Sequence, residues 1–91
     1  IRSDVDVRTL VDAHRSRSFD HTGITLDPNL ALPVDRLREL VQNGRIGSVG
    51  TRHLSFMGSI TAPGRLARTT APKAACLLAE DGVDAAILIP V

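Results

Sequence analysis

The closing stretch DGVDAAILIPV, residues 81–91, constrains the fold more than any other part of the chain. Asp81-Gly82 is a typical helix exit, because glycine readily adopts the left-handed backbone conformation that ends a helix. From Ala85 to Val91 the chain carries no charge and is rich in branched aliphatic side chains. Such a run indicates a strand buried on both faces, as in a parallel sheet that helices cover on each side.

Two earlier segments complete a strand–helix–strand unit. Residues 52–57 alternate in polarity, which predicts a strand. Thr70 and Pro72 suit the start of a helix that runs to about Glu80. Crossovers between parallel strands are right-handed, and helices pack on the faces of such sheets. We therefore expect an α/β fold, a partial doubly wound parallel sheet of Rossmann-like or flavodoxin-like type with flanking helices.

The first half of the chain is expected to be helical and rich in loops. The segment LPVDRLRELVQNG, residues 32–44, predicts a helix that ends at Asn43-Gly44. A short helical turn is expected around residues 7–11 with Asp4 or Asp6 near its start, although Val5 and Val7 also alternate as in a strand. Residues 19–33 are expected to form an ordered loop with a turn at 27–29, and a further helical turn is expected around residues 65–68.

The length of the chain limits it to one small domain. A chain of 91 residues buries only about 60–65% of the surface that its unfolded form exposes, so its stability is marginal without a partner. We therefore expect residues 1–91 to be a single incomplete α/β domain that occurs in an oligomer.

Charge and hydropathy argue against two classes of partner. The net charge is only +1, and Phe19 and Phe56 are the only Phe, Tyr or Trp residues, so nucleic-acid binding is not expected. No apolar run approaches the ~20 residues of a membrane span, so no membrane partner is expected. The single cysteine, Cys76, cannot form an internal disulfide, which favours a reducing, cytoplasmic setting. The abundance of Arg, Ala and Val is typical of a bacterial protein from a GC-rich genome.

Five polar residues are candidates for a substrate pocket: Asp20 and His21 in the long loop, and Arg52, His53 and Ser55 on the predicted strand. An aspartate beside a histidine can orient the imidazole, and His53 and Ser55, two residues apart, point to the same face of a strand. Each candidate also has a structural interpretation. Asp20 and His21 suit a turn, and His53 suits a hydrogen-bonded strand histidine. Ser55 lacks the G-x-S-x-G setting of a hydrolase nucleophile.

No cofactor or metal site is predicted. The glycine-rich segment GRIGSVG matches neither the dinucleotide-binding motif nor the P-loop, and the histidines lack zinc-ligand spacing. Cys76 lies among Ala and Leu in the middle of a predicted helix, where we expect a small buried hydrophobe rather than a nucleophile.

A long basic stretch separates two acidic parts of the chain. From Gly44 to Ala79 there is no acidic residue but five basic ones: Arg45, Arg52, Arg65, Arg68 and Lys73. Such a stretch favours anions, which fits a carboxylate substrate or an acidic partner. A solvated face that the acidic N-terminal segment neutralises is the alternative.

Three segments taken together resemble the protein B family of amino-acid reductases. They are FDHTGITLDPNLALPVDRLRELVQNGRIGSVG, RHLSFMGSITAPGRL and TAPKAACLLAEDGVDAAILIPV. The resemblance covers residues 19–91 and rests on the order and spacing of Asp20-His21 and of the short motifs at 32–37, 55–58 and 81–85. The family comprises the selenocysteine or cysteine subunits of glycine, sarcosine and betaine reductases and of D-proline reductase.

This resemblance implies the reductive cleavage of a carbon–nitrogen bond in a small amino-acid-like substrate. In the family, a pyruvoyl-containing partner subunit holds the substrate amine, and a selenolate or thiolate of protein B attacks the α-carbon. The redox residue of the family follows the strand that here ends in LIPV. The resemblance therefore implies that residues 1–91 are the N-terminal portion of a longer reductase subunit, and that they supply scaffold and pocket but not the nucleophile. Two alternatives stay open: a non-catalytic α/β interaction module, and a thiol-dependent oxidoreductase with another substrate.

Overall fold

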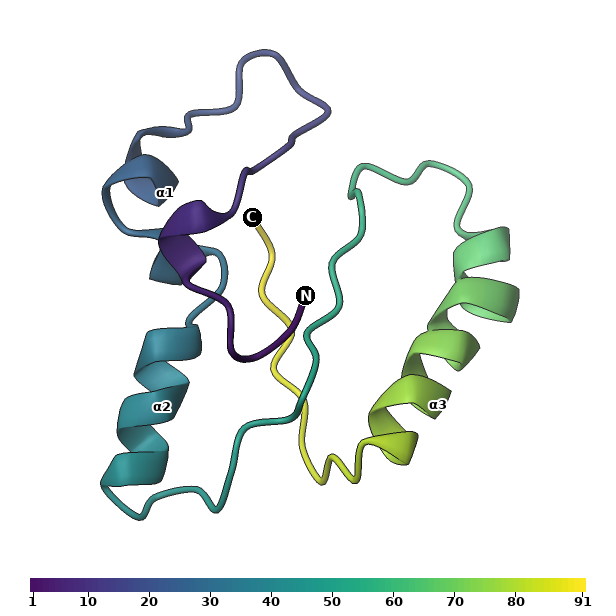
Figure 1. Cartoon of the computed structure of the whole chain (residues 1–91). Helices are drawn as coiled ribbons and strands as arrows, with labels where there is room; N and C mark the ends of the chain where they lie inside the picture. The colour runs from purple at the N-terminus through teal and green to yellow at the C-terminus, as the bar shows by residue number, and fades with distance from the viewer.

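The computed structural model describes all 91 residues and contains helices joined by long extended segments. Its elements follow the order η1 (Val7–Thr9), α1 (Thr22–Leu26), η2 (Pro28–Leu30), α2 (Val34–Gln42), η3 (Leu66–Thr70) and α3 (Ala71–Glu80). α2 and the helix formed by η3 and α3 lie on opposite sides of the molecule, and extended chain passes between them (Figure 1).

The expected parallel sheet is absent, so the predicted α/β fold class is wrong. The only bridge between extended residues joins Arg2 to Arg52, and it is antiparallel. Residues 85–91 run back between the helices but form no regular strand (Figure 1). An apolar run indicates that a segment needs burial, whereas a strand also needs a neighbour that pairs with its backbone over several residues. The chain provides the apolar run without such a neighbour.

α2 begins and ends where local signals place it. Pro33 precedes its first residue, and Asn43 caps its C-terminus with Gly44 just beyond. Gly44 has a φ of 69°, in the left-handed region that glycine occupies without steric cost. Val34 is completely buried on the inner face of the helix. The predicted helix over residues 33–42 and its glycine stop are therefore confirmed.

The helix at the other side of the molecule is longer than expected. Helical backbone begins at Gly64, passes through the π-helical turn η3 and continues into α3. Thr70 was expected to cap α3, but its backbone is already helical and its side chain makes no capping hydrogen bond. The expected helical turn around residues 65–68 is thus the first part of one continuous helix, which ends at Gly82 with a φ of 69°.

The first third of the chain contains more helix than its sequence predicts. Residues 19–33, expected to be a loop, contain α1 and η2. The expected turn at 27–29 is present, because the Asp27 carboxylate accepts a hydrogen bond from the Asn29 amide at 3.0 Å. The helical interpretation of residues 7–11 is confirmed in part by η1, whose N-terminus Asp6 caps through the amide of Arg8.

The molecule encloses little of its surface. Val7 and Val34 are its only buried residues. Its accessible surface is 7279 Å², whereas a compact monomer of 9.7 kDa exposes about 5,100 Å². Its shortest dimension is 18 Å, which is less than the width of two packed helices of about 10–12 Å each. The molecule is therefore too thin to enclose a large core.

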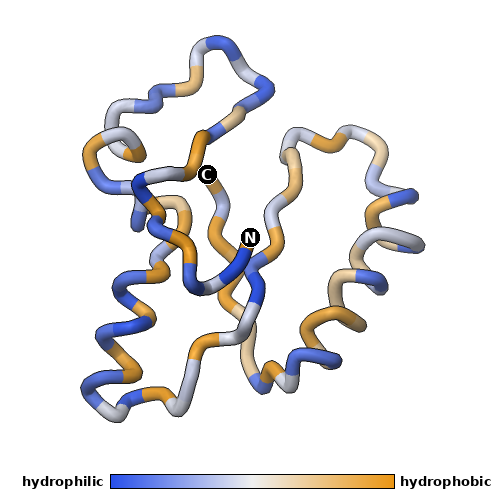
Figure 2. The backbone as a smooth tube through the Cα atoms, viewed as in Figure 1, coloured by the Kyte–Doolittle hydropathy of each residue, from blue (hydrophilic) through white to orange (hydrophobic).

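Apolar residues follow the extended segments in the middle of the molecule (Figure 2) and leave large hydrophobic side chains accessible, among them Phe56, Ile87 and Leu88. No helix combines the length and the apolar character needed to cross a bilayer.

Candidate functional site

The candidate site forms where the N-terminal segment pairs with residues 51–53. The amide of Ser3 donates to the carbonyl of Thr51 at 3.1 Å, and the amide of His53 donates to the carbonyl of Ile1 at 2.6 Å. The nitrogen of Ile1 returns a bond to the carbonyl of His53 at 2.8 Å. This short antiparallel contact joins segments about fifty residues apart in sequence and brings Ser3 beside His53.

Ser3 and His53 form a hydrogen-bonded pair that is partly shielded from solvent. The Ser3 hydroxyl bonds to the carbonyl of Gly50, and its Oγ lies 3.0 Å from Nε2 of His53. A hydroxyl has one proton to donate, and a carbonyl can only accept. Once Ser3 donates to Gly50, its oxygen accepts a bond from Nε2–H of His53. This arrangement leaves Nδ1 of His53 without a proton, so Nδ1 is the ring nitrogen that can take one up.

The environment of His53 favours its neutral form. Burial lowers the pKa of the imidazole below 6.5, and the positive charge of Arg38 lowers it further. A neutral imidazole near pH 7 can accept a proton or hold a hydroxyl, whereas an imidazolium can only donate. The pair formed by Ser3 and His53 is therefore suited to bind a polar substrate group or to move a proton.

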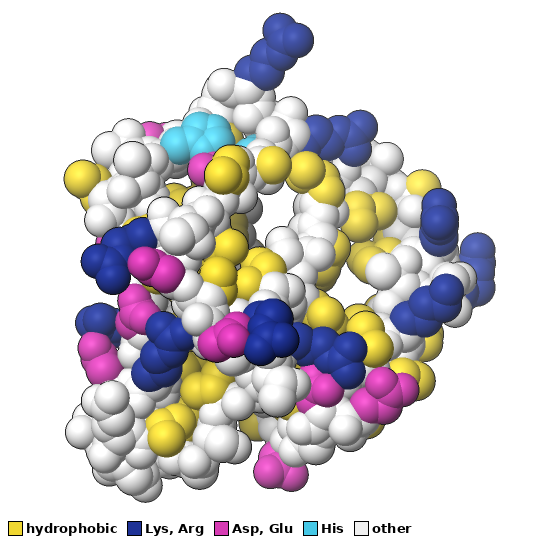
Figure 3. All heavy atoms as spheres, in the orientation of Figure 1, with side chains coloured by type: hydrophobic (Ala, Val, Ile, Leu, Met, Phe, Trp, Pro, Cys, Tyr) yellow, Lys and Arg dark blue, Asp and Glu magenta, His cyan; other side chains and the backbone are white.

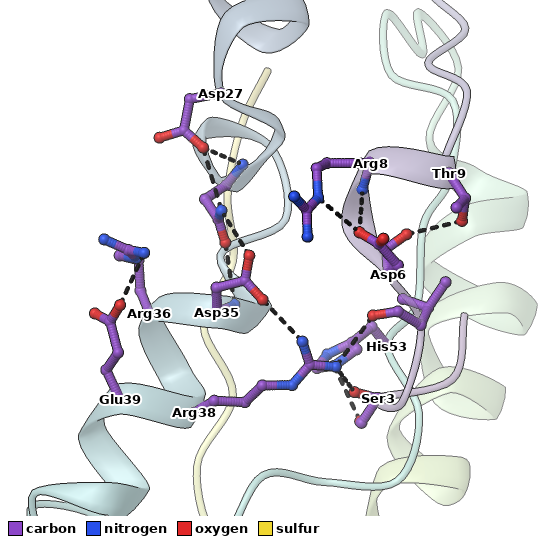
Figure 4. Close-up of polar contacts among 12 residues, drawn as sticks. Ser3, Asp6, Arg8, Thr9, Asp27, Asp35, Arg36, Arg38, Glu39 and His53 are labelled. Atoms are coloured by element: carbon purple, nitrogen blue, oxygen red, sulfur yellow. Dashed lines mark hydrogen bonds and ion pairs between the residues drawn. The ribbon is translucent and has the colours of Figure 1, made fainter.

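Arg38 of α2 fixes the N-terminal segment in this position. One guanidinium nitrogen donates to the carbonyls of Ser3 at 2.6 Å and of Val5 at 3.0 Å, and the other donates to the Asp35 carboxylate at 2.8 Å (Figure 4). Asn29 donates to Asp35 from the far side at 3.1 Å. The hydrogen bond from Asn29 and the guanidinium of Arg38 hold the pKa of Asp35 below its usual range.

A hollow of about 420 Å³ adjoins this network. It lies between η1 and the connection from α1 to α2, and both basic and acidic side chains line it, including Arg8, Asp27 and Asp35. Arg8 is 81% exposed and pairs loosely with Asp6 at 3.1 Å. The hollow is within the size range of small-molecule pockets, about 300–1,000 Å³, and it offers both signs of charge to a ligand.

The guanidinium of Arg52, which was expected to face a substrate, instead pairs with acidic residues at the end of α3. It donates two hydrogen bonds to the Asp81 carboxylate, at 2.5 and 2.8 Å, and lies 3.7 Å from Glu80. These bonds from Arg52 lower the pKa of Asp81 and raise the pKa of Arg52. The geometry therefore gives Arg52 a structural role between the extended segment and α3.

Asp20 and His21 lie together, apart from the Ser3–His53 pair. Asp20 accepts a hydrogen bond from the amide of Thr22 at 2.9 Å, at the start of α1. Hydrogen bonds from the side chain and the backbone of Thr22 lower the pKa of Asp20. His21 bonds to Asp12 through Nδ1 and meets the edge of the Phe19 ring, whose centroid is 4.9 Å away. No hydrogen bond or ion pair joins this exposed group to His53.

Two other sequence expectations concern Ser55 and Cys76. Ser55 is exposed on the extended segment beyond His53, and no side-chain hydrogen bond involves it. Cys76 was expected to be buried, and that expectation is wrong, because the cysteine is exposed on α3. α3 borders the molecule instead of being covered on both sides (Figure 1).

Ser3, Arg8, Asp27 and Arg38 were missed as site residues. Arg8 and Arg38 resemble ordinary solvent-facing charges in the sequence, and Ser3 reaches His53 only through contacts distant in sequence. Asp27 was recognised only as a turn residue. Its turn signal could have drawn attention to the long segment that lines the hollow.

Comparison with known proteins identifies relatives of the chain. The family model for glycine/sarcosine/betaine reductase selenoprotein B matches residues 4–90. The chain is 30% identical over 88 residues to D-proline reductase subunit gamma of Acetoanaerobium sticklandii. It is 36% identical over 70 residues to sarcosine reductase complex component B subunit beta of Peptoclostridium acidaminophilum.

The alignments cover 97% and 77% of this chain but only 36% and 16% of those two relatives, so the chain spans a minor part of their length. No solved structure matches the chain. The family match includes His53, Arg38 and the residues that line the adjoining hollow, whereas Ser3 lies just before its first residue. The chain belongs to the glycine/sarcosine/betaine reductase selenoprotein B family.

Proposed function

We propose that these residues are part of one larger domain of a reductase subunit, which cleaves a carbon–nitrogen bond in a small amino-acid-like substrate. Glycine, sarcosine, betaine and proline are the candidate substrates. The match to the reductase family over residues 4–90 supports the reaction class. The two relatives are a D-proline reductase subunit and a component of a sarcosine reductase complex, which supports this substrate class.

The observation that carries the proposal is the mixed charge of the hollow beside Asp35. A small amino acid has a carboxylate and a cationic amine, so its pocket needs a cation and an anion a short distance apart. Arg8 is suited to bind the carboxylate, because a guanidinium recognises a carboxylate through two parallel hydrogen bonds. Asp27 and Asp35 provide negative charge for the amine or quaternary ammonium group.

His53 and Ser3 are proposed to complete the pocket as a neutral hydrogen-bonding pair. The lowered pKa of His53 makes its imidazole an acceptor near pH 7, which suits proton transfer to the departing amine or from the entering substrate. Asp20, His21, Arg52 and Ser55 are proposed as further pocket residues of the complete subunit. Arg52 would act there through its ion pair with Asp81.

The nucleophile is proposed to come from a residue outside these 91. Reductive cleavage needs a thiolate or selenolate that attacks carbon and a dithiol that then restores it. Cys76 is the only thiol of the chain. It lies on α3, and the extended segments separate α3 from η1 and α2, whose residues line the hollow (Figure 1). For substrates with a free amine, a pyruvoyl-containing partner subunit is proposed to hold that amine during cleavage, after Asp27 and Asp35 have attracted it as a cation.

The test is reductase activity of the full-length subunit, assembled with its partner subunits and supplied with a dithiol and each of the four substrates. Arg8→Gln should raise KM by about ten- to a hundredfold with a smaller effect on kcat, because it removes a charged hydrogen bond to the carboxylate. Arg36→Gln is the matched control. It removes another exposed arginine that pairs with a carboxylate, Glu39, at 2.8 Å.

Two results would contradict the proposal. One is the absence of dithiol-dependent cleavage with all four substrates. The other is equal KM values for Arg8→Gln and Arg36→Gln, which would show that the hollow does not bind the substrate carboxylate. Mutation of each cysteine or selenocysteine in the full-length subunit then locates the nucleophile, and loss of activity on replacing Cys76 would refute a nucleophile outside these residues.

A further inference from the structure

Four of the five basic residues between Gly44 and Ala79 fall into two groups in the structure, and the fifth, Arg45, lies just beyond α2. Arg52 is neutralised by Asp81. Arg65, Arg68 and Lys73 are exposed on the continuous helix formed by residues 64–80, and none of them has a carboxylate within ion-pair distance. Basic side chains project along the right-hand edge of the molecule, and acidic ones appear only towards its lower end (Figure 3). This edge therefore carries uncompensated positive charge.

An apolar hollow of about 290 Å³ lies beside these cations. Phe56, Met57 and Ile60 line one side of it, and Arg65, Leu66 and Thr70 line the helix side. Phe56 is 67% exposed and Met57 is 50% exposed, so solvent reaches the apolar walls. Leu66 and Thr70 belong to the π-helical turn, a local distortion of helices that occurs frequently at functional sites.

The helix that borders this hollow carries the three cations. Arg65 lines it directly. The guanidinium of Arg68 folds back over Gly64, so close that a Cβ atom at position 64 would lie 2.9 Å from its Nη2 atom. Lys73 follows Thr70 by three residues, which places the two on the same side of the helix. One cation therefore lines the apolar depression at the start of the helix, and the other two follow on the same helix.

We propose that this basic docking surface, the apolar hollow with Arg65, Arg68 and Lys73, binds an acidic face of another subunit of the reductase complex. The partner would present carboxylates to the three cations and an apolar side chain to the hollow. Charge complementarity carries the choice of partner, because three neighbouring cations lack acids of their own chain. Nucleic acid fits less well, since the hollow contains a single aromatic ring.

The inference rests on the proposed function, because it assigns the partner to the reductase complex. Its own evidence is the charge and shape of the surface, which are independent of the hollow that Arg8 lines.

The experiment measures association of the full-length subunit with the purified partner subunits of its complex, at low and at high ionic strength. The double substitution Arg65→Glu and Arg68→Glu should slow association about tenfold or more at low salt, and the difference should shrink at high salt because salt screens exposed charges. Leu66→Ala should instead speed dissociation by removing an apolar wall. Arg45→Glu makes a comparable charge reversal beyond the end of α2 and should leave association unchanged.

Hydrogen exchange of residues 64–80 distinguishes a partner from the remainder of the same subunit. Protection that appears only in the complex supports the proposal, whereas equal protection in the free subunit shows that its own chain covers the surface and overturns it. The proposal is also overturned if the charge reversals leave the association rate unchanged. A third refuting result is that a duplex oligonucleotide binds in a way that depends on Arg65 and Arg68, while binding of the partner subunits does not depend on them. A complex that assembles through these charges but has no reductase activity refutes the proposed reaction alone.

Discussion

Arg38 offers the sharpest test of how the candidate site is held together. Its guanidinium bonds to the carbonyls of Ser3 and Val5, so Arg38→Ala removes both tethers of the N-terminal segment. Each hydrogen bond from a charged donor contributes about 1.5–3 kcal/mol, and the lower value applies here because the side chain is partly exposed. The exposed pair with Asp35 adds little. The expected loss is about 3 kcal/mol in the free energy of docking the segment onto residues 51–53.

Hydrogen exchange of the full-length subunit measures this loss directly. The amides of Ser3 and His53 are bonded only while the segment is docked, to Thr51 and Ile1 respectively. A loss of 3 kcal/mol should speed their exchange about a hundredfold, whereas the amides of α2 should change much less. Arg38→Lys should have an intermediate effect, because an ammonium group cannot reach Asp35 and both carbonyls in the same geometry.

Arg36→Ala is the control for this experiment. It removes an arginine from the same helix that contacts only Glu39. Equal acceleration of the two amides by Arg36→Ala and Arg38→Ala would refute the assignment, as would unchanged protection in Arg38→Ala.

Two further predictions follow from backbone geometry and from pH. Gly44→Ala should destabilise the subunit by about 1 kcal/mol in denaturant unfolding, since φ is 69° there; Gly47→Ala, at an open position without positive φ, should have no such cost. The bonds from Arg52 lower the folded pKa of Asp81 below 3.8. The Arg52–Asp81 pair therefore stabilises the folded state fully above the unfolded-state pKa of Asp81, and this stabilisation is lost as pH falls through the folded-state pKa. Asp81→Asn should accordingly weaken the dependence of the unfolding free energy on acid pH. An unchanged acid dependence would contradict the pairing.

The parts of the fold that the sequence predicted are those set by local chemistry. α2 ends at Gly44 and α3 ends before Gly82 because each glycine adopts the left-handed conformation within its own turn. Asp6 and Asp27 cap short helical turns through amides two residues away. None of these features depends on distant parts of the chain, so a single sequence contains the information that determines them.

The sheet could not be predicted correctly because strand pairing is a property of two segments. The apolar run at 85–91 and the alternating segment at 52–57 each resemble a strand in isolation. The structure pairs Arg52 with Arg2 instead, which lies before the alternating residues Val5 and Val7 of the N-terminal segment. Alternation along one segment does not identify the segment that lies beside it.

Only some residues of the candidate site were singled out from the sequence, because the others depend on contacts between segments that lie far apart in the chain. His53 stood out because it and Ser55 were expected on one face of a strand, and it lies in a polar network that also fits its structural interpretation as a hydrogen-bonded histidine. Arg52 also stood out, but its neighbour in space is Asp81, which is 29 residues away. Ser3 and Arg38 acquire their roles only when α2 and the N-terminal segment meet, and no spacing in the sequence signals that contact.

The distribution of apolar residues connects the fold to the proposed assembly. The radius of gyration is 14.5 Å, compared with about 12 Å for a compact chain of this length. The excess exposure includes the extended segments, where Phe56, Ile87 and Leu88 are each more than half exposed. Ile87 and Leu88 are neighbours in the sequence, and exposed apolar patches of soluble proteins typically mark contact surfaces. The residues that make the sequence resemble a buried sheet therefore need cover that the 91 residues do not supply, either from the rest of the subunit or from a partner. Hydrogen exchange of residues 85–91 in the free full-length subunit separates these sources, because protection before assembly assigns the cover to the subunit itself.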